Sequence, residues 1–446
     1  MNENNTAATG TVCNPELFHF LAVKKRSVSA SFTGGEVTSD GGIPLLRQTD
    51  RRIGLTKALA KVLSDPRAPE RIEHPLLSIV RQRIYGLAQG YEDLNDHDTL
   101  RHDLAWQTAV EREGPLASSP TLCRLENRAD RSATWAAHQV IVEQFIASFA
   151  WPPTELVLDF DATDDRVHGQ QEGRFFHGYY GDYCFLPLYV FCGEQLLVSY
   201  LRRANGDAAR HAWAVLKLLV ARLRQAWPQV KIIFRGDSGF CRWRLLRWCE
   251  AHQVRYLVGL AKNARVLGLA QRWLEQAQTD FMAQQHKQRL FGEVQYGAET
   301  WDQERRVLVK AEHTAKGSNP RFVVTNLEGE AQTLYDELYC ARGEMENRIK
   351  EQQLGLFADR TSCHGWWANQ FRLLLSSCAY VLMERLRALG LAGTELARAQ
   401  VGTIRLKLLK IGAVVLRNTR RVRLLLSSGY PYQALFGQVV KALASG

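Results

Sequence analysis

The sequence predicts an α/β protein whose central sheet carries acidic side chains at one edge, with mainly helical regions before and after it along the chain. Three observations lead to this prediction. Residues 155–261 alternate β-rich runs with helical runs, the first of these strands mixes apolar residues with carboxylates, and the composition is that of a globular protein. With 446 residues, 46% of them hydrophobic and 23% charged, the chain is long enough to bury several cores.

The N-terminal region, residues 1 to about 150, is expected to be mainly helical after a strand-like entry at 27–42. Ser119 or Pro120 is suited to open a helix, because serine caps the free N–H groups of a first turn and proline has none to leave unpaired. The region ends near Pro152-Pro153, a pair typical of a linker, since a proline pushes the residue before it out of the helical conformation.

The segment after this linker contains the strands of the expected sheet. Strand-like and helix-like runs follow in the order β, β, β, α, β, α, β. Three antiparallel strands followed by a right-handed crossover into a parallel strand form the topology of an RNase H-like sheet, although helix–strand alternation also suits a doubly wound sheet. The expected strands are 155–161, 182–192, 195–204, 231–240 and 255–261, and the expected helices are 208–227 and 241–253.

Two acidic residues stand at the ends of strands that are neighbours in this topology. Asp161 ends the first strand, and Asp237 ends the fourth within RGDSGF. Carboxylates that converge at one sheet edge repel each other, and a divalent cation removes that penalty. Either residue alone is more typical of a turn cap. Asp159 shares the face of Asp161 by the two-residue period of a strand and is the alternative ligand.

A third acid comes from a helix late in the chain. The run 335–356 has helical composition, and Tyr339, Arg342, Glu346 and Lys350 follow one another at spacings of three, four and four. At this spacing the four side chains share one stripe of a helix. The alternative is a solvated face with a Glu346–Lys350 pair worth about 0.3 kcal/mol.

The combination of DFDATD, RGDSGF and the Tyr339-x-x-Arg342-x-x-x-Glu346 motif resembles bacterial insertion-sequence transposases of the DDE class, in the branch named for that Tyr, Arg, Glu arrangement. The stretch 168–191 is similar to that family as well, and the resemblance covers about residues 20 to 440. It implies an RNase H-like (retroviral-integrase-like) catalytic domain with a β-rich insertion. It also implies that the catalytic, metal-binding residues are Asp161, Asp237 and Glu346.

The resemblance also implies a division of the chain. Strand-like runs at 289–298, 305–314 and 321–327 agree with an insertion between the second and third acids. The expected parts are a helical region for DNA-end recognition (1–150), the first part of the catalytic core (151–270), the insertion (271–330), the helix that completes the core (331–365) and a basic helical region for DNA binding and oligomerisation (366–446).

The implied cofactor is Mg²⁺, with Mn²⁺ able to substitute, because three carboxylates without His or Cys suit a hard cation. Two such ions activate a water for phosphodiester hydrolysis and stabilise the leaving 3′ oxygen. The freed 3′-OH then attacks target DNA in the same site. A phosphate-binding G-x-x-x-x-G-K-[ST] loop is absent from the sequence, so no nucleotide cofactor is expected.

Four further residues are DNA-binding candidates. Arg342 and Lys350 would hold phosphates, and Tyr339 would pack against the DNA backbone or against the sheet. Trp301 would stack on an unpaired base, although a tryptophan more often covers a sheet. One position departs from the family pattern, since Gln353 stands where a Lys is expected seven residues after Glu346.

The distribution of charge favours a DNA partner, and the apolar pattern of the sequence favours a cytoplasmic protein. From Trp366 to Gly446 there are twelve Lys and Arg against two Glu, which accounts for most of the formal charge of +11. A basic surface favours a polyanion such as DNA, although a pI near 9 also occurs in proteins that bind none. The sequence has neither a leader-like start nor an apolar run that spans a bilayer, so a cytoplasmic protein is expected, with no membrane partner.

The expected function is therefore DNA transposition. The protein would bind terminal inverted repeats, cleave DNA at the element ends and join 3′-OH ends to target DNA, as a homodimer in the synaptic complex. Two alternatives stay open, a metal-dependent nuclease of the same fold that does not join, and a non-catalytic DNA-binding protein derived from a transposase.

Overall fold

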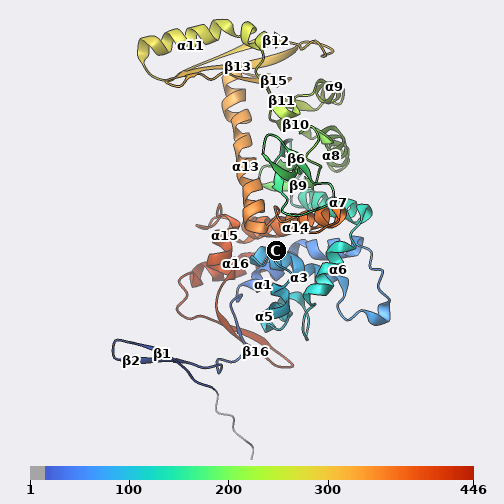
Figure 1. The fold of residues 1–446 in the computed structure, drawn as a ribbon, viewed down its shortest axis with the longest axis vertical. Coiled ribbons are helices and arrows are strands. Elements are labelled where there is room, and N and C mark those ends of the chain that lie inside the picture. The colour runs from blue at the N-terminus through green and yellow to red at the C-terminus, as the bar shows by residue number, and fades with distance from the viewer. Residues whose placement is uncertain (1–15, 446) are drawn as a thin grey trace, which may run out of the picture.

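The structure, a computed structural model, describes residues 16–445 as an elongated molecule (Figure 1). A long sheet occupies the upper part of the view, a helical base lies below it, and one long helical segment runs along the side from the top of the sheet to the base. No helix among the described residues is both long and apolar enough to cross a membrane.

The N-terminal region is mainly helical, as its sequence predicts. Helix α6 begins at Ser119 with a proline in its first turn, and α5 is capped by Asp103, whose carboxylate accepts hydrogen bonds from the N–H groups of Ala105 and Trp106. The elements are β1 (Phe18–Val23), β2 (Arg26–Ala30), β3 (Val37–Thr38), α1 (Ile43–Ile53), α2 (Leu55–Val62), α3 (Leu76–Gln89), α4 (Asp96–Leu100), α5 (Leu104–Val110), α6 (Ser119–Asn127) and α7 (Arg131–Ala147).

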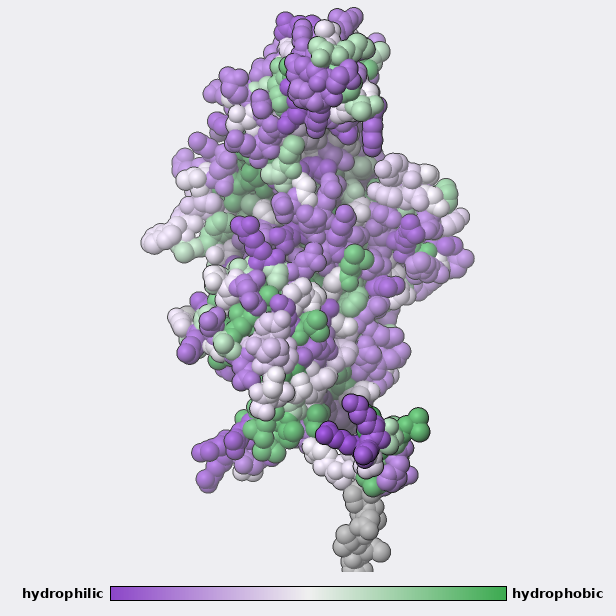
Figure 2. All heavy atoms as spheres, turned by 90° about the vertical axis from the view of Figure 1, so that its left-hand side faces the viewer, coloured by the Kyte–Doolittle hydropathy of each residue, from purple (hydrophilic) through white to green (hydrophobic). Residues whose placement is uncertain are grey.

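The β1–β2 hairpin projects from the base, away from the rest of the molecule (Figure 1). Its apolar side chains are open to solvent, with 61% of Phe20, 94% of Leu21 and 62% of Val23 exposed. Figure 2 shows one face of the molecule that is largely hydrophilic, while hydrophobic side chains gather toward its lower end, where the projecting hairpins lie.

The central sheet has the strand order β12-β13-β15-β11-β10-β4-β8-β9. Strand β4 lies antiparallel to β8 and parallel to β10, so the predicted neighbourhood of the first and fourth strands is confirmed. The run expected as one strand over 182–192 is two strands, because Pro187 lacks the N–H that would continue the ladder. The elements are β4 (Glu155–Ala162), β5 (Asp165–Arg166), β6 (Phe175–His177), β7 (Asp182–Phe185), β8 (Leu188–Cys192), β9 (Gln195–Tyr200), α8 (Ala212–Ala226), β10 (Lys231–Gly236), α9 (Trp243–Ala251) and β11 (Arg255–Leu260).

The two faces of β4 have different partners. Leu156, Leu158 and Phe160 pack in one core with side chains of α8 and α9. Val157 lies on the opposite face with the side chains of the long helical segment. Figure 1 shows these helices on the two sides of the sheet. The acidic row of β4 therefore faces the helix that carries Glu346.

The region expected as a separate β-rich insertion is an extension of the same sheet. Strand β15 pairs antiparallel with β11, and β13 pairs with β15, so hydrogen bonds run without interruption from one part to the other. Helix α10 (Ala264–Leu269) precedes the region, and the region itself begins with a helix, which the strand-rich expectation omitted. Its elements are α11 (Gln271–Gln284), β12 (Gln288–Tyr296), β13 (Arg305–Thr314), β14 (Gly317–Ser318) and β15 (Arg321–Thr325).

The helix predicted over 335–356 is present as part of a longer helical segment of changing pitch. It contains two π-helical stretches, and such stretches are often found at functional sites. Its parts are α12 (Ala331–Thr333), the π-helix η3 (Leu334–Tyr339), the 3₁₀-helix η4 (Cys340–Arg342), α13 (Gly343–Lys350) and the π-helix η5 (Glu351–Gly355).

The base combines both ends of the chain. Helix α14 packs against α1, α3 and α7, and β16 pairs with β3 as well as with β17. The region 366–446, expected to be helical, therefore contains a β-hairpin as well, whose strands are rich in Val and Leu with one arginine in each. Its elements are α14 (Trp366–Gly390), α15 (Val401–Ile404), the π-helix η6 (Arg405–Leu409), β16 (Ala413–Arg417), β17 (Val422–Leu426) and α16 (Gln433–Ala444).

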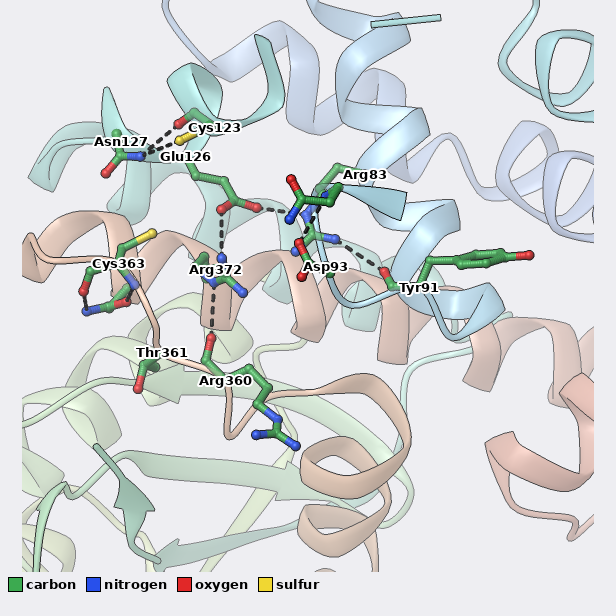
Figure 3. Close-up of polar contacts among 12 residues, drawn as sticks. Arg83, Tyr91, Asp93, Cys123, Glu126, Asn127, Arg360, Thr361, Cys363 and Arg372 are labelled. Carbon is green, nitrogen blue, oxygen red and sulfur yellow. Dashed lines mark hydrogen bonds and ion pairs between the residues drawn. The ribbon is translucent and has the colours of Figure 1, made fainter. Parts of the chain in front are cut away.

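A buried ion network joins the N-terminal helices to α14 (Figure 3). Glu126 of α6 is fully buried and accepts hydrogen bonds from Arg83 of α3 at 2.7 Å and from Arg372 of α14 at 3.1 Å. Arg372 also donates to the carbonyl oxygen of Arg360 at 3.0 Å. The next residue, Thr361, donates to Asp165 of β5 at 3.0 Å, so polar contacts run from the base to the strand that follows β4.

Candidate active site

The carboxyl ends of β4 and β10 bring two acids to one sheet edge. Asp161 is the last residue but one of β4, and Asp237 follows β10 directly. Asp161 Oδ1 accepts a hydrogen bond from the N–H of Ala162 at 2.9 Å. Asp237 Oδ1 accepts one from the N–H of Gly239 at 2.8 Å, which is the turn cap that the sequence also allowed. Each carboxylate uses one oxygen for the backbone, and the other is left for a further partner.

Asp159, the alternative ligand, has a structural partner. Arg235 lies beside it in the register of β4 and β10, and its guanidinium binds both carboxylate oxygens, with Nη2 at 2.6 Å from Oδ2. Asp159 is 2% exposed, and Arg235 also donates to the carbonyl oxygen of Leu338. A carboxylate held on both oxygens by one guanidinium is poorly placed to bind a metal ion. Asp161 is the acid of β4 that remains available.

The long helical segment brings Arg342 and Glu346 to the same place. Arg342 Nη2 donates to Glu346 Oε1 at 2.9 Å, and its Nη1 lies 3.6 Å from Asp161 Oδ2. Only 17% of the Arg342 side chain is exposed. One guanidinium therefore stands between a carboxylate of the sheet and a carboxylate of the helix.

The charge balance at this edge is negative. Burial raises the pKa of Asp161 to about 6, the nearby Arg342 opposes that rise, and the negative charges of Asp237 and Glu346 add to it. Asp237 and Glu346 therefore belong to the electrostatic surroundings of Asp161. A single arginine among three acids leaves excess negative charge at the edge of the sheet.

Tyr339 packs against the sheet, one of the two roles that the sequence allowed. Its hydroxyl lies 2.6 Å from where a Cβ on Gly259 of β11 would stand, so only glycine at this position leaves room for the ring. Burial raises the pKa of Tyr339, with Arg342 and Asp237 as the nearest charges. The tyrosine thus fixes the distance between the helix and the carboxyl ends of the strands.

The two positions after Glu346 differ in their surroundings. Lys350 is exposed on α13. Gln353, which stands where the family pattern has a lysine, donates from Nε2 to the carbonyl oxygen of Asp164 at 3.1 Å. The amide therefore ties the helix to the loop that follows β4, a contact that adds no positive charge to the site.

Trp301 lies at the opposite edge of the sheet. Its ring packs edge-on against Tyr296 at 5.5 Å, and the Arg305 guanidinium lies 5.5 Å from its centre. Arg305 pairs with Glu250, just before β11 begins, whereas the acids stand where β4 and β10 end. The side chain of Trp301 is half-buried in this packing, which corresponds to the other role considered for it, that of covering the sheet.

The arrangement does not close into a metal site on its own. No group of three or more His, Cys, Asp or Glu side chains within residues 16–445 is placed to hold a metal ion. The donor chemistry nevertheless fits a hard divalent cation, since the side chains nearest to one another are carboxylates and already hold a cationic guanidinium between them.

Many basic residues of the C-terminal part serve the fold. Arg387 is 3% exposed and pairs with Glu351, and Lys410 pairs with Asp40 at 2.7 Å. Arg405 donates to carbonyl oxygens of Ala88 and Gly355. Four exposed arginines lie instead on the β16–β17 hairpin, a grouping that the charge count alone does not reveal, and one of them, Arg417, also donates to Gln107: Arg417, Arg420, Arg421 and Arg423.

Comparison with known proteins agrees with the resemblance in the sequence. A family model described as "Transposase DDE domain group 1" matches residues 20–445. A solved structure, the cryo-EM structure of a piggyBac transposase synaptic complex with hairpin DNA, is similar with a TM-score of 0.43 and 10% sequence identity, covering 92% of this chain and 82% of the other. None of the curated proteins matches the chain.

Proposed function

The chain belongs to the transposase DDE domain family, and from that premise we propose that it binds the terminal inverted repeats of an insertion sequence, cleaves DNA at the element ends and joins the 3′-OH ends to target DNA. The observation that carries the proposal is that Asp161 and Glu346 share one guanidinium, while Asp237 stands at the carboxyl end of the neighbouring parallel strand. We propose these three acids as the catalytic triad.

The strand order supports an RNase H-like assignment for the catalytic sheet. Strands β9, β8 and β4 are antiparallel neighbours, and β4, β10 and β11 are parallel neighbours, with helices α8 and α9 in the crossovers. This is the order expected from the sequence. In this fold the acids at the ends of the first and fourth strands would face the substrate.

The three carboxylates would hold the divalent cation, with Mg²⁺ or Mn²⁺ the ions that suit oxygen ligands. When bound, the cation would activate the attacking oxygen and stabilise the leaving 3′ oxygen. Arg342 would then be free to bind a phosphate of the DNA, because its present partners would be engaged. Asp159 and Arg235 would keep the strands in register beneath the acids.

DNA binding away from the acids would rest on exposed arginines. The β16–β17 hairpin carries them at the end of the molecule opposite the insertion strands (Figure 1). Phosphate contacts by arginine are distributed and independent of sequence. Replacement of a single acid should therefore leave the affinity for DNA nearly unchanged. Two protomers would hold the two ends of the element together.

The test is cleavage and joining by purified protein with Mg²⁺ or Mn²⁺. Asp161→Ala, Asp237→Ala and Glu346→Ala should each reduce cleavage by more than about 100-fold, since even residues that only support metal ligands cost 10- to 100-fold. Glu344→Ala is the matched control, because Glu344 is an exposed acid on the same helix. Full activity in the Asp161 variant would show that the triad is wrong.

Joining separates a transposase from a nuclease. A pre-cut end with a free 3′-OH should be joined to target DNA, and a dideoxy 3′ end should not, because the attacking oxygen is missing. Cleavage of uncut ends without joined product across metals and targets would identify a nuclease. Tight end binding without either activity would identify a non-catalytic DNA-binding protein.

A further inference from the structure

A small three-stranded sheet that follows β4 exposes several aromatic rings to solvent, although Phe176 packs edge-on against Tyr183 and Tyr179 against Tyr180. It is formed by β5, β7 and β6 in that order, and we call β6, β7 and the turn between them the aromatic hairpin (residues 175–185). The exposed fractions are 56% for Phe176, 86% for Tyr179 and 46% for Tyr183. Isolated exposed rings are common, but three within eight residues form a patch that marks an interaction site.

The aromatic hairpin adjoins the acidic edge of the catalytic sheet. Strand β5, which pairs with β7, begins at Asp165, in the loop that directly follows Asp161. Tyr180 of the turn is half-buried, and burial followed by the negative charges of Asp164 and Asp161 raises its pKa to about 12. A molecule bound at the acids would therefore pass beside the exposed rings.

Arginines accompany the rings. The Arg174 guanidinium lies 4.4 Å from the centre of the Tyr183 ring, and that of Arg203 lies 6.0 Å from the rings of both Phe175 and Trp366. Arg166 is shared between Asp164 at 3.7 Å and Asp182 at 3.8 Å, so its charge is already balanced. Rings interleaved with cations are the composition of single-stranded nucleic acid sites, in which bases stack and arginines meet phosphates.

We infer that the aromatic hairpin is a stacking platform for an unpaired nucleotide of the DNA end, with Tyr179 and Phe176 stacking on the base and Arg174 meeting its phosphate. This inference rests on the proposed function, because it takes the DNA end to lie at Asp161. It places the unpaired nucleotide at a segment that directly follows β4. Trp301 then has only the structural role of covering the sheet.

The experiment uses the full-length protein without metal ions and two DNA ends, one blunt and one with a three-nucleotide single-stranded extension carrying 2-aminopurine. Tyr179→Ala should weaken binding to the extended end by about 10-fold, within the range for loss of one stacked base, and should abolish quenching of 2-aminopurine. Binding to the blunt end should not change. Tyr179→Phe should behave as wild type, because it keeps the ring.

Trp151→Ala provides the matched control, since Trp151 is 83% exposed and lies in the linker before β4. It should leave both affinities unchanged. Equal affinities for Tyr179→Ala and Trp151→Ala on the extended end would overturn the platform, as would an equal loss on the blunt end. If either result is obtained while the wild type cleaves DNA normally, the stacking platform is wrong and the proposed function stands. If the wild type quenches 2-aminopurine but neither cleaves nor joins DNA, the proposed function is wrong and the stacking platform stands.

Discussion

Two buried carboxylates of this chain, Glu126 in the base and Asp161 at the sheet edge, are neutralised to different extents. Glu126 is fully buried between the guanidinium groups of Arg83 and Arg372, each within hydrogen-bond distance (Figure 3). Asp161 has one guanidinium, from Arg342 at 3.6 Å, and shares it with Glu346. Glu126, which joins helices, is neutralised by two guanidinium groups. Asp161, at the sheet edge, is only partly neutralised, and its remaining negative charge does not stabilise the fold.

Removing the matched acid should have the largest effect on stability. Glu126→Ala leaves two buried guanidinium groups without their partner, so we expect the free energy of unfolding to fall by about 3–5 kcal/mol. Urea denaturation measures it. Glu143→Ala is the control, because Glu143 pairs with Arg222 at the surface and should cost less than about 1 kcal/mol. Equal losses would mean that burial does not distinguish the two ion pairs.

Replacing Asp161 by a neutral residue should instead raise the free energy of unfolding. Because the folded protein raises the pKa of Asp161 from 3.8 to about 6, mainly by burial, folding favours the protonated form. Stability should therefore fall as the pH rises from about 4 to about 6 and stay lower above that range. In metal-free protein at pH 8, Asp161→Asn should raise the free energy of unfolding by about 1–3 kcal/mol.

The same variant should show no gain at about pH 2, below both pKa values, where the wild-type carboxyl is protonated in the folded and the unfolded state. Asp159→Asn serves as the comparison, since its ion pair with Arg235 is structural and its loss should destabilise the protein at pH 8. Denaturation curves at the two pH values settle both points. Destabilisation by Asp161→Asn at pH 8 would show that Arg342 already neutralises this acid completely.

Arg342 itself should compete with a divalent cation for the acids. Arg342→Gln removes a positive charge from beside Asp161 and Glu346, which should favour cation binding by about 1 kcal/mol, or roughly 5-fold in affinity. Titration calorimetry with Mn²⁺ in the absence of DNA measures this directly. Weaker Mn²⁺ binding by the variant would indicate that Arg342 holds the acids in their binding geometry.

The smallest effect on stability should come from the exposed arginines. Replacing Arg420, Arg421 and Arg423 together by Gln should leave the denaturation midpoint nearly unchanged, because they are exposed on the β16–β17 hairpin, whereas Arg417 is kept because it donates to Gln107 at 2.8 Å. The same change should flatten the dependence of DNA affinity on salt by up to about 0.9 per lost phosphate contact. An unaltered salt slope in a folded variant would assign these arginines a role other than DNA contact.

Local patterns in the sequence predict the parts of the site that depend on one strand or one helix. The alternation in residues 155–161 predicts β4 and the placement of Asp159 and Asp161 on one face. It does not distinguish them, because the choice depends on Arg235, which lies beside Asp159 only through the register of two strands. The pairing is visible in principle, since parallel alignment of the two predicted strands by their first residues, Glu155 and Lys231, brings Asp159 beside Arg235.

Contacts between distant segments are the part that the sequence does not predict. Glu126 meets Arg372 across 246 residues, and no local pattern around either residue indicates this pairing. The continuity of β15 with β11 is hidden as well, since a strand-like run does not say which edge it joins. Charge counting likewise places the excess in the last fifth of the chain but cannot separate buried Arg387 from the exposed arginines of the hairpin.

The pairing of β3 with β16 sets an order of events during synthesis. Val37 lies opposite Val414, so the N-terminal strand waits for its partner while nearly the whole chain is translated, tens of seconds at roughly 5–20 residues per second. Strands β4 and β10, at whose ends Asp161 and Asp237 stand, emerge from the ribosome before then. A product that ends before β16 would carry the acidic sheet edge while β3 lacks its partner strand, so completion of the base is a late step that only a full-length chain can reach.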